Sequence, residues 1–376
     1  MERQLALSSA ANSRCHPLPK GLSPSCLFMN KAARNAIGLA TATAGALLAV
    51  WLTLPLPWMI GALLATALSK MAGSPAQSHR VFRNGGQWVI GTSLGLYFTP
   101  DMIRVIGLNL PFILLGSLFA LGLGALGSVI LRSLGGTDFK TAWFASAIGG
   151  ASEMTTLAER YHARTDLVAS AHSLRMLMVV VSIPFAFRAL GIQGNEVSLP
   201  QAAAFFDATG LLLLIVLTSA MGLFFQRFRM PNPWVLGPLL VTTLLTSNGI
   251  VFTHLPTELT NLGQLLIGWS LGDKFGPEFF RRAPRYLSVV ALSNGINILL
   301  AFAFSYLLFL ISDIPFPTLV LGTSPGGIAE MAITAKVLML GAPVVTAFHA
   351  IRMVCVLLAT APLYNLLAGR HESRTL

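Results

Sequence analysis

Two stretches of this chain are near-copies of each other, and both place ionisable side chains inside apolar sequence. Gly149-Gly150-x-x-Glu153-Met154, followed by His172-x-x-Arg175-Met176, recurs as Gly326-Gly327-x-x-Glu330-Met331, followed by His349-x-x-Arg352-Met353. Each residue of the first set lies 177 positions before its counterpart. Because ionisable groups are unfavourable in hydrocarbon, a doubled set of them predicts a site at the interface of two repeats.

The duplication extends beyond these charged motifs. Residues 86–100 and 263–277 are identical at nine of fifteen positions, where chance gives roughly one. Pro57-Trp58 recurs as Pro233-Trp234, one residue out of register. We therefore predict two homologous halves, 36–190 and 207–368, preceded by a flexible basic cytoplasmic tail, 1–35.

Composition places the chain in a membrane. The sequence is 54% hydrophobic and 10% charged, with a mean hydropathy of +0.71, whereas soluble domains average about 25% charged residues. The alternating pattern of an outer-membrane barrel is missing, so we expect a polytopic α-helical protein. The net charge of +11 lies mainly in loops and matches no nucleic-acid-binding motif, so we expect no direct binding of nucleic acid.

Each half contains six apolar elements. Six full crossings per half would leave the halves parallel, whereas five crossings and one element that enters and leaves on the same side would invert them. The first half has elements near 37–54, 57–72, 86–100, 109–131, 142–160 and 167–188. The second has elements near 207–226, 233–252, 261–273, 286–311, 317–340 and 343–368.

The distribution of basic residues favours the inverted arrangement. Twelve full crossings would divide the 23 Lys and Arg outside the two motifs into 13 inside and 10 outside. The inverted arrangement puts 20 inside, including Arg281, Arg282 and Arg374, and leaves Arg104, Arg188 and Lys336 outside. Basic residues concentrate on the cytoplasmic side of membrane proteins, so we predict inverted repeats with both termini in the cytoplasm.

The Gly-Gly-x-x-Glu element is the natural one to break. A Gly pair tolerates irregular backbone, and Pro325 before Gly326 cannot donate a helix hydrogen bond. Irregular backbone at membrane depth is tolerated where protein or a wet cavity satisfies it. We therefore predict an all-α polytopic membrane protein with two inverted repeats, about ten spanning helices and two broken or re-entrant elements.

Two interpretations remain open for the acidic residues. Glu153 and Glu330 follow the Gly pairs by three positions, where a carboxylate in a first helical turn complements the helix dipole. Alternatively, each is a proton- or ligand-binding carboxylate in a midplane cavity. The two interpretations are compatible.

Two interpretations also remain open for the basic pairs. His172 and Arg175, like His349 and Arg352, lie three residues apart and share a helix face. Internal ion pairs of each Arg with the Glu of its own half would lock that half together. Otherwise the arginines hold an anionic substrate while the histidines relay protons.

Gln87 and Gln264 lie in short glycine-rich segments together with Ser93 and Ser270. Close helix packing explains the glycines, but the Gln side chains are also candidates for lining the cavity. The three cysteines are scattered and the seven histidines form no sequence cluster. We therefore expect no metal and no cofactor.

The duplicated Gly-Gln-x-x-Ile-Gly-x-Ser-Leu-Gly segment and the Glu/His/Arg motifs resemble the bacterial membrane AbrB family. The resemblance covers about residues 36–368. Members of that family carry a duplicated domain and are labelled either ammonia monooxygenases or regulators of gene expression. The family is similar to the superfamily of cation/proton antiporters and anion transporters, which implies inverted repeats with discontinuous helices.

The resemblance and the residues together lead to ranked functional expectations. We expect a secondary transporter of the inner membrane, proton- or cation-coupled, for a small molecule or ion. The alternative is a membrane regulator that affects transcription indirectly. An enzyme is the least expected class, because copper or iron oxidation requires a richer ligand cluster. Partners are the lipid bilayer and the substrate, with homo-oligomerisation left open.

Overall fold

The computed structural model describes residues 30–192, 194, 207–277, 279 and 283–372. The described residues form fifteen α-helices and no strands, which confirms the all-helical expectation. Most of the predicted tail, residues 1–29, lies outside the described residues, as do Arg281, Arg282 and Arg374.

The first half of the chain contributes eight helices. Residues 142–160, which the sequence predicts as one broken element, form two short helices, α6 and α7. The bounds are α1 (Lys31–Trp51), α2 (Pro57–Met71), α3 (Arg80–Gly95), α4 (Pro100–Leu108), α5 (Leu110–Gly135), α6 (Phe139–Ser146), α7 (Ala151–Arg160) and α8 (Thr165–Ala189).

The second half repeats this order without a helix equivalent to α4 among the described residues. Its helices are α9 (Ala208–Arg227), α10 (Pro233–Ser247), α11 (Thr257–Gly272), α12 (Pro284–Phe309), α13 (Phe316–Thr323), α14 (Ile328–Val337) and α15 (Ala342–Glu372). Three pairs, α3 and α11, α6 and α13, and α7 and α14, begin and end 177 residues apart. The duplication in sequence is therefore also a duplication of helix boundaries.

Local signals explain several boundaries that hydropathy alone misses. Helix α3 begins at Arg80 rather than at residue 86, because the ring of His79 caps it; hydropathy misses this start because the first turn carries Arg80 and Arg83. Helix α4 was not expected from the sequence, because it is amphipathic and carries Asp101 and Arg104. It begins at Pro100, where Thr99 accepts a hydrogen bond from the Met102 amide.

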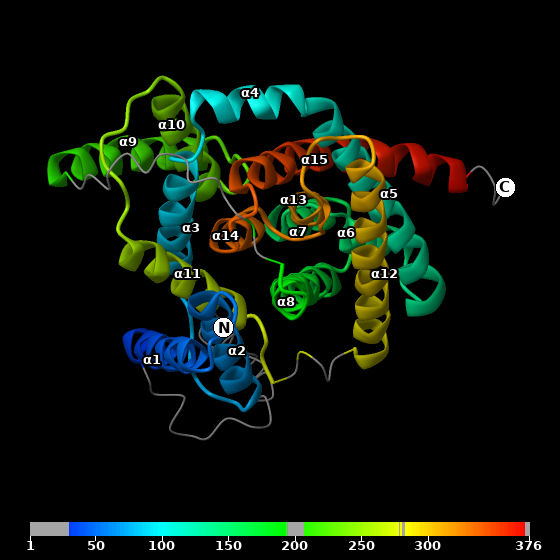
Figure 1. Cartoon of the computed structure of the whole chain (residues 1–376). Helices are drawn as coiled ribbons and strands as arrows, with labels where there is room; N and C mark the ends of the chain where they lie inside the picture. Colours follow the sequence, from blue (N-terminus) through cyan, green and yellow to red (C-terminus); the bar gives the residue numbers. More distant parts are fainter. Residues whose placement is uncertain (1–29, 193, 195–206, 278, 280–282, 373–376) are drawn as a thin grey trace, which may run out of the picture.

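Short helices of each half pack against short helices of the other half. Helix α2 packs against α11 of the second half, and α10 packs against α3 of the first half. Helices α3 and α11 cross at two glycines, since a Cβ at Gly86 would meet the carbonyl oxygen of Gly263 at 2.8 Å. On the other side of the molecule, α5 and α12 lie side by side and run in opposite directions (Figure 1).

Six described helices are long and apolar enough to cross a membrane: α1, α5, α8, α9, α12 and α15. Large apolar side chains of α9 and α12 are exposed, among them Leu212, Val216, Leu299 and Phe302. Helices α2, α3, α10 and α11 have 15 or 16 residues, or about 22–24 Å at 1.5 Å per residue. A hydrocarbon core is about 30 Å thick, so length and hydropathy alone support six spans rather than ten.

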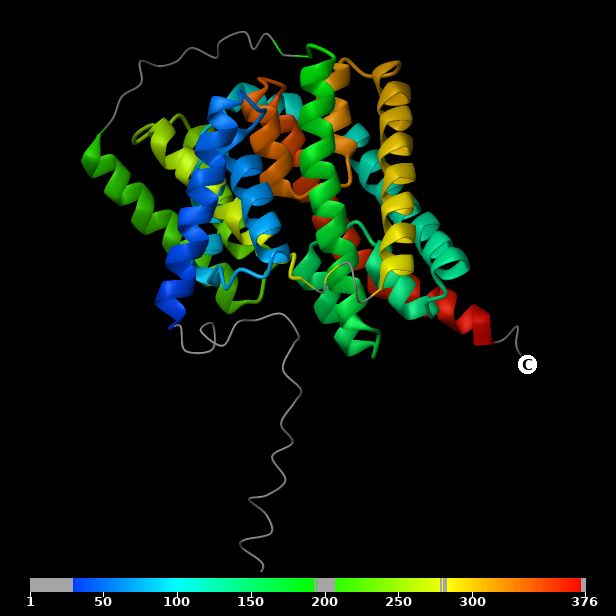
Figure 2. The ribbon, with the colours of Figure 1, turned by 90° about the horizontal axis from the view of Figure 1, so that it is seen from below.

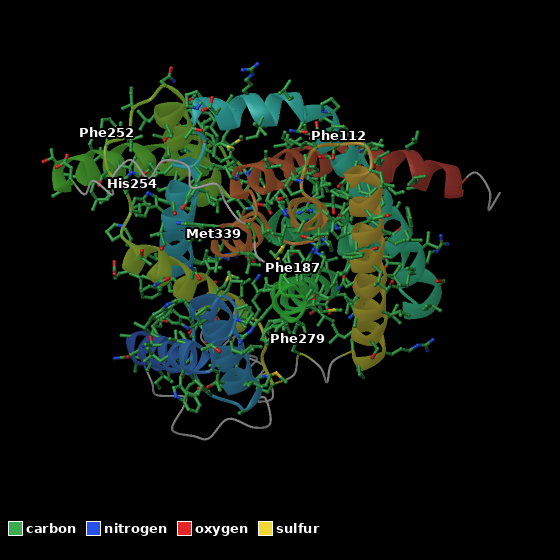
Figure 3. All side chains as sticks on the ribbon, viewed as in Figure 1. Phe112, Phe187, Phe252, His254, Phe279 and Met339 are labelled. Carbon is green, nitrogen blue, oxygen red and sulfur yellow. The ribbon has the colours of Figure 1, made fainter. Side chains whose placement is uncertain are left out.

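The largest apolar cluster lies where the two halves meet. It joins residues of α2, α3, α8, α10, α11, α13, α14 and α15, including Met59, Ile90, Val179, Val235 and Ile328. Phe187, which belongs to this cluster, lies near the middle of the molecule in Figure 3. Figure 2 shows the same bundle seen from below, with α8 seen lengthwise beside α12. Of the short helices, α6, α13 and α14 are mostly buried, whereas α7 has exposed residues at Ser152, Glu159 and Arg160.

Candidate functional site

The site begins with two interruptions in helical structure. The chain leaves the helical conformation at residues 147–150, between α6 and α7, and at 324–327, between α13 and α14. Both interruptions contain the Gly pairs, where the sequence predicts them. Each exposes carbonyl groups at the end of one helix and N–H groups at the start of the next, because helix ends leave these groups without partners in the helix.

The two motif arginines satisfy the carbonyl side of the breaks. Arg175 donates from Nη1 to Ala147 O at 2.8 Å and from Nη2 to Gly149 O at 2.9 Å. Arg352 makes the equivalent bonds to Ser324 O at 2.5 Å and Gly326 O at 2.6 Å. A planar guanidinium suits this role, since its fork of donors reaches two oxygens at once. Each arginine therefore holds the irregular segment of its own half.

The two histidines join the same helices. His172 donates from Nε2 to Phe144 O at 3.0 Å, and His349 donates from Nε2 to Leu321 O at 2.9 Å. The Nδ1 atom of His349 accepts from Arg352 Nη2 at 2.7 Å. A ring that donates through one nitrogen and accepts through the other is a neutral imidazole. His349 therefore orients Arg352 and fixes α15 to α13.

The two glutamates occupy the N–H side of the breaks. Glu153 lies in the first turn of α7, and Glu330 lies in the first turn of α14. Their carboxylates fold back over the helix starts, where a Cβ at Gly150 or Gly327 would collide with Glu153 Oε2 or Glu330 Oε2. Glycine at these positions therefore leaves room for a carboxylate over the positive end of a helix dipole.

These groups line a single cavity of about 40 Å³, which is room for roughly three water-sized groups. The cavity contains both breaks, with ten of the twelve predicted site residues on its wall. They are Gln87, Gly149, Gly150, Glu153, Arg175, Gly326, Gly327, Glu330, His349 and Arg352. Residues separated by 177 positions therefore meet in one place.

Two predicted residues do not line this cavity. His172 is fully buried against α6. Gln264 is buried next to the glycine crossing of α3 and α11, so its partner Gln87 alone reaches the cavity. Ser93, which shares a segment with Gln87, instead accepts a hydrogen bond from Lys336 Nζ at 2.6 Å. The two halves are thus similar but not equivalent.

The cavity also has lining residues that were not predicted as site residues, and two of them, Arg83 and Asn232, are polar groups from outside the two motifs. Arg83 lies on α3 one helical turn before Gln87, and that spacing of four is the signal that could have revealed it. Asn232 precedes α10, and its backbone N–H donates to Glu153 Oε1 at 3.4 Å. It adopts φ 42°, a conformation that asparagine tolerates well. The equivalent residue, Leu56, is buried and apolar.

The cavity is also unequally exposed. Glu153 and Arg83 are partly exposed and Ser152 is exposed, whereas Glu330 is 6% exposed. The ion pairs expected as one alternative, Arg175 with Glu153 and Arg352 with Glu330, are not among the ion pairs of the described residues. Carbonyl groups take their place. Among those same residues no cluster of three His, Cys, Asp or Glu side chains could hold a metal ion.

Comparison with known proteins identifies the family. A model of the family described as "Transition state regulatory protein AbrB" matches residues 58–368. The chain belongs to the AbrB family. This assignment confirms the resemblance inferred from the duplicated motifs.

Two relatives cover most of the chain. "Uncharacterized protein YhjN" of Bacillus subtilis (strain 168) is 26% identical over 367 residues, which is 89% of this chain and 94% of that protein. "Putative regulator AbrB" of Escherichia coli (strain K12) is 26% identical over 307 residues, which is 81% of this chain and 88% of that protein. Together with the apolar helices, the family places this chain among membrane proteins.

Proposed function

We propose that this chain is a secondary transporter of the bacterial inner membrane, with its substrate site in the cavity between the two helix breaks. The supporting observation is that both breaks, both glutamates and both motif arginines line one cavity within an apolar bundle. Transporters built from repeats bind their substrates at such discontinuous helices near the middle of the bilayer. Breaks of this kind are disfavoured in lipid unless they line a cavity.

The proposal includes inverted repeats, ten spanning helices and cytoplasmic termini. It is supported by the helix boundaries that recur at 177 residues, by the antiparallel run of α5 and α12 (Figure 1), and by the distribution of basic residues. In this arrangement four short helices also cross the membrane. Each packs against a short helix of the other half, α2 against α11 and α3 against α10. Local thinning of the bilayer accommodates such short spans.

In the proposed mechanism, the carboxylates of Glu153 and Glu330 carry the coupling proton or cation, and Arg175 and Arg352 orient the substrate. His349 acts through Arg352, whose guanidinium donates to its Nδ1 atom, whereas His172 fixes α8 to α6 through the Phe144 carbonyl. No catalytic residue is assigned, and no enzymatic reaction is proposed.

Flux through proteoliposomes tests this function. Purified full-length protein is reconstituted, and solute uptake is recorded together with the pH inside the vesicles for a panel of small organic acids, amines and inorganic ions. We expect solute uptake that Glu153→Gln combined with Glu330→Gln abolishes. The control is Glu159→Gln, an exposed glutamate of the same helix α7. Unchanged uptake in the double variant would remove both carboxylates from the mechanism.

The family description and the name of the Escherichia coli relative favour a second candidate, a role in regulation. We propose that any such effect is indirect and follows the transported solute. In that case the double Glu variant loses both flux and the transcriptional effect. A transcriptional effect that survives without flux would instead indicate a separate regulatory activity.

A further inference from the structure

The charges around the cavity are unbalanced. Arg83, Arg175 and Arg352 line it together with Glu153 and Glu330, so three positive charges face two negative ones, which leaves one positive charge when both carboxylates are ionised. His349 adds no charge in the neutral form that its hydrogen bonds require. Lys274 lies close enough to interact electrostatically with Glu330 and Arg83. The charges on the cavity wall therefore favour an anion.

The buried arginines still have donors to offer. Arg175 is 4% exposed and Arg352 is 5% exposed, and the Nε atoms of both have no hydrogen-bond partner among the described residues. The two guanidinium groups also lie close enough to repel each other. Buried donors without acceptors are unfavourable, and an anion with several oxygens would supply the acceptors and screen the repulsion.

The carboxylates are poorly placed to hold a cation other than a proton, which narrows the coupling ion of the proposed function to the proton. Glu153 and Glu330 already lie over the starts of α7 and α14, whose positive dipole ends they complement. A cation near either carboxylate would also meet those dipole ends and the neighbouring arginines. The same groups that disfavour a cation favour an anion.

Size and access limit the anion further. A cavity of about 40 Å³ accepts a group of only a few heavy atoms. On the cavity wall Arg83 and Glu153 are partly exposed and Ser152 is exposed, whereas Glu330, Arg175 and Arg352 are buried. Arg83 is thus the lining arginine that an entering anion can reach from solvent.

From this geometry we infer that the cavity is a site for a small monoanion with a carboxylate or planar oxyanion group, and that Arg83 is one of its binding residues. The inference rests on the proposed transport function and names its substrate class.

An anion site beside the two glutamates also predicts how proton binding and anion binding affect each other. A proton on Glu153 or Glu330 removes a negative charge beside the anion, so proton and anion favour each other's binding. Such positive coupling suits symport.

Binding of nitrate to the purified full-length protein in nanodiscs tests the inference. Nitrate stays anionic across the accessible pH range, and isothermal titration calorimetry in a chloride-free Tris–HEPES buffer, which contains no carboxylate, measures its affinity. We expect Arg83→Gln to weaken binding by ~10-fold or more. The matched control is Arg80→Gln, an exposed residue of the same helix that does not line the cavity, which should leave the affinity unchanged.

The glutamate variants separate an anion site from a cation site. Glu153→Gln and Glu330→Gln mimic the protonated carboxyls, so we expect each to tighten nitrate binding. Nitrate binding that these variants weaken, or that Arg83→Gln leaves unchanged, would overturn the inference. So would binding of sodium or ammonium that the same variants abolish.

The two proposals fail in different ways. Nitrate binding without uptake of any solute would leave the anion site standing and contradict the transport function. Cation uptake that depends on the glutamates would keep the transport function and overturn the anion class.

Discussion

At the residue scale, the irregular segments depend on a few long side chains that reach across from neighbouring helices. Arg352 contacts two carbonyl oxygens of the α13–α14 break and the ring of His349. Arg175 repeats the carbonyl contacts in the first half. These bonds replace the helical hydrogen bonds that the breaks give up, which is why both halves carry the same Arg at the same spacing.

Arg352→Lys should lower stability, because an ammonium group cannot span two carbonyls and an imidazole as a planar guanidinium does. We expect a loss of roughly 1.5–3 kcal/mol for each charge-assisted hydrogen bond that is not replaced. Thermal unfolding of the detergent-solubilised protein measures it, with the exposed Arg160→Lys as the matched control. Equal unfolding temperatures for the two variants would mean that Arg352 does not hold the break.

Most residues of the candidate site could be predicted from the sequence, but the contacts that they make could not. The duplicated motifs identify Glu, His and Arg because their chemistry is unusual in apolar sequence. They do not reveal that the arginines bind carbonyls rather than glutamates, since that depends on where the helices end. Asn232 could not be predicted, because it lies in a loop 79 positions after Glu153 in the sequence and meets it only in the fold.

At the element scale, close glycine contacts join the two halves. A Cβ at Gly91 of α3 would collide with Val235 O of α10, and a Cβ at Gly268 of α11 would collide with Met59 O of α2. The two glycines lie 177 residues apart and make equivalent contacts. The sequence shows these glycines and predicts close packing, but it does not say which helix each one faces.

Gly91→Ala and Gly268→Ala should therefore each destabilise the protein. The obstructing atoms are backbone, so the helices themselves must move apart, and we expect a loss of roughly 1–3 kcal/mol. Gly122→Ala in α5 is the control, because open space surrounds its Cβ position and alanine favours a helix by up to ~1 kcal/mol over glycine. Denaturation midpoints of the three variants give the comparison. Three equal midpoints would mean that the helices at Gly91 and Gly268 have room for a methyl group, which would contradict the close contacts.

At the scale of the whole molecule, the orientation of the two halves relative to each other decides how the site sits in the membrane. The duplication, the swapped packing of α2 and α10, and the opposed α5 and α12 all fit two halves that insert in opposite directions. Hydropathy alone could not establish this arrangement. Only six described helices are long enough to qualify as spans, and the four helices that pack across the two halves, α2, α3, α10 and α11, are shorter. The sequence predicts two copies of the site motifs. It does not predict that helices of one half pack against helices of the other, because that depends on the three-dimensional fold.

Cysteine labelling at two equivalent positions tests the orientation most directly. Arg80 and Thr257 are exposed residues that begin α3 and α11, and they lie 177 positions apart. Each is changed to Cys after Cys15, Cys26 and Cys355 are replaced by Ser, and intact cells with a permeable outer membrane are treated with a membrane-impermeant maleimide. We predict labelling of Thr257→Cys in intact cells and of Arg80→Cys only after the inner membrane is disrupted. Labelling of both positions from the same side would contradict the inverted arrangement.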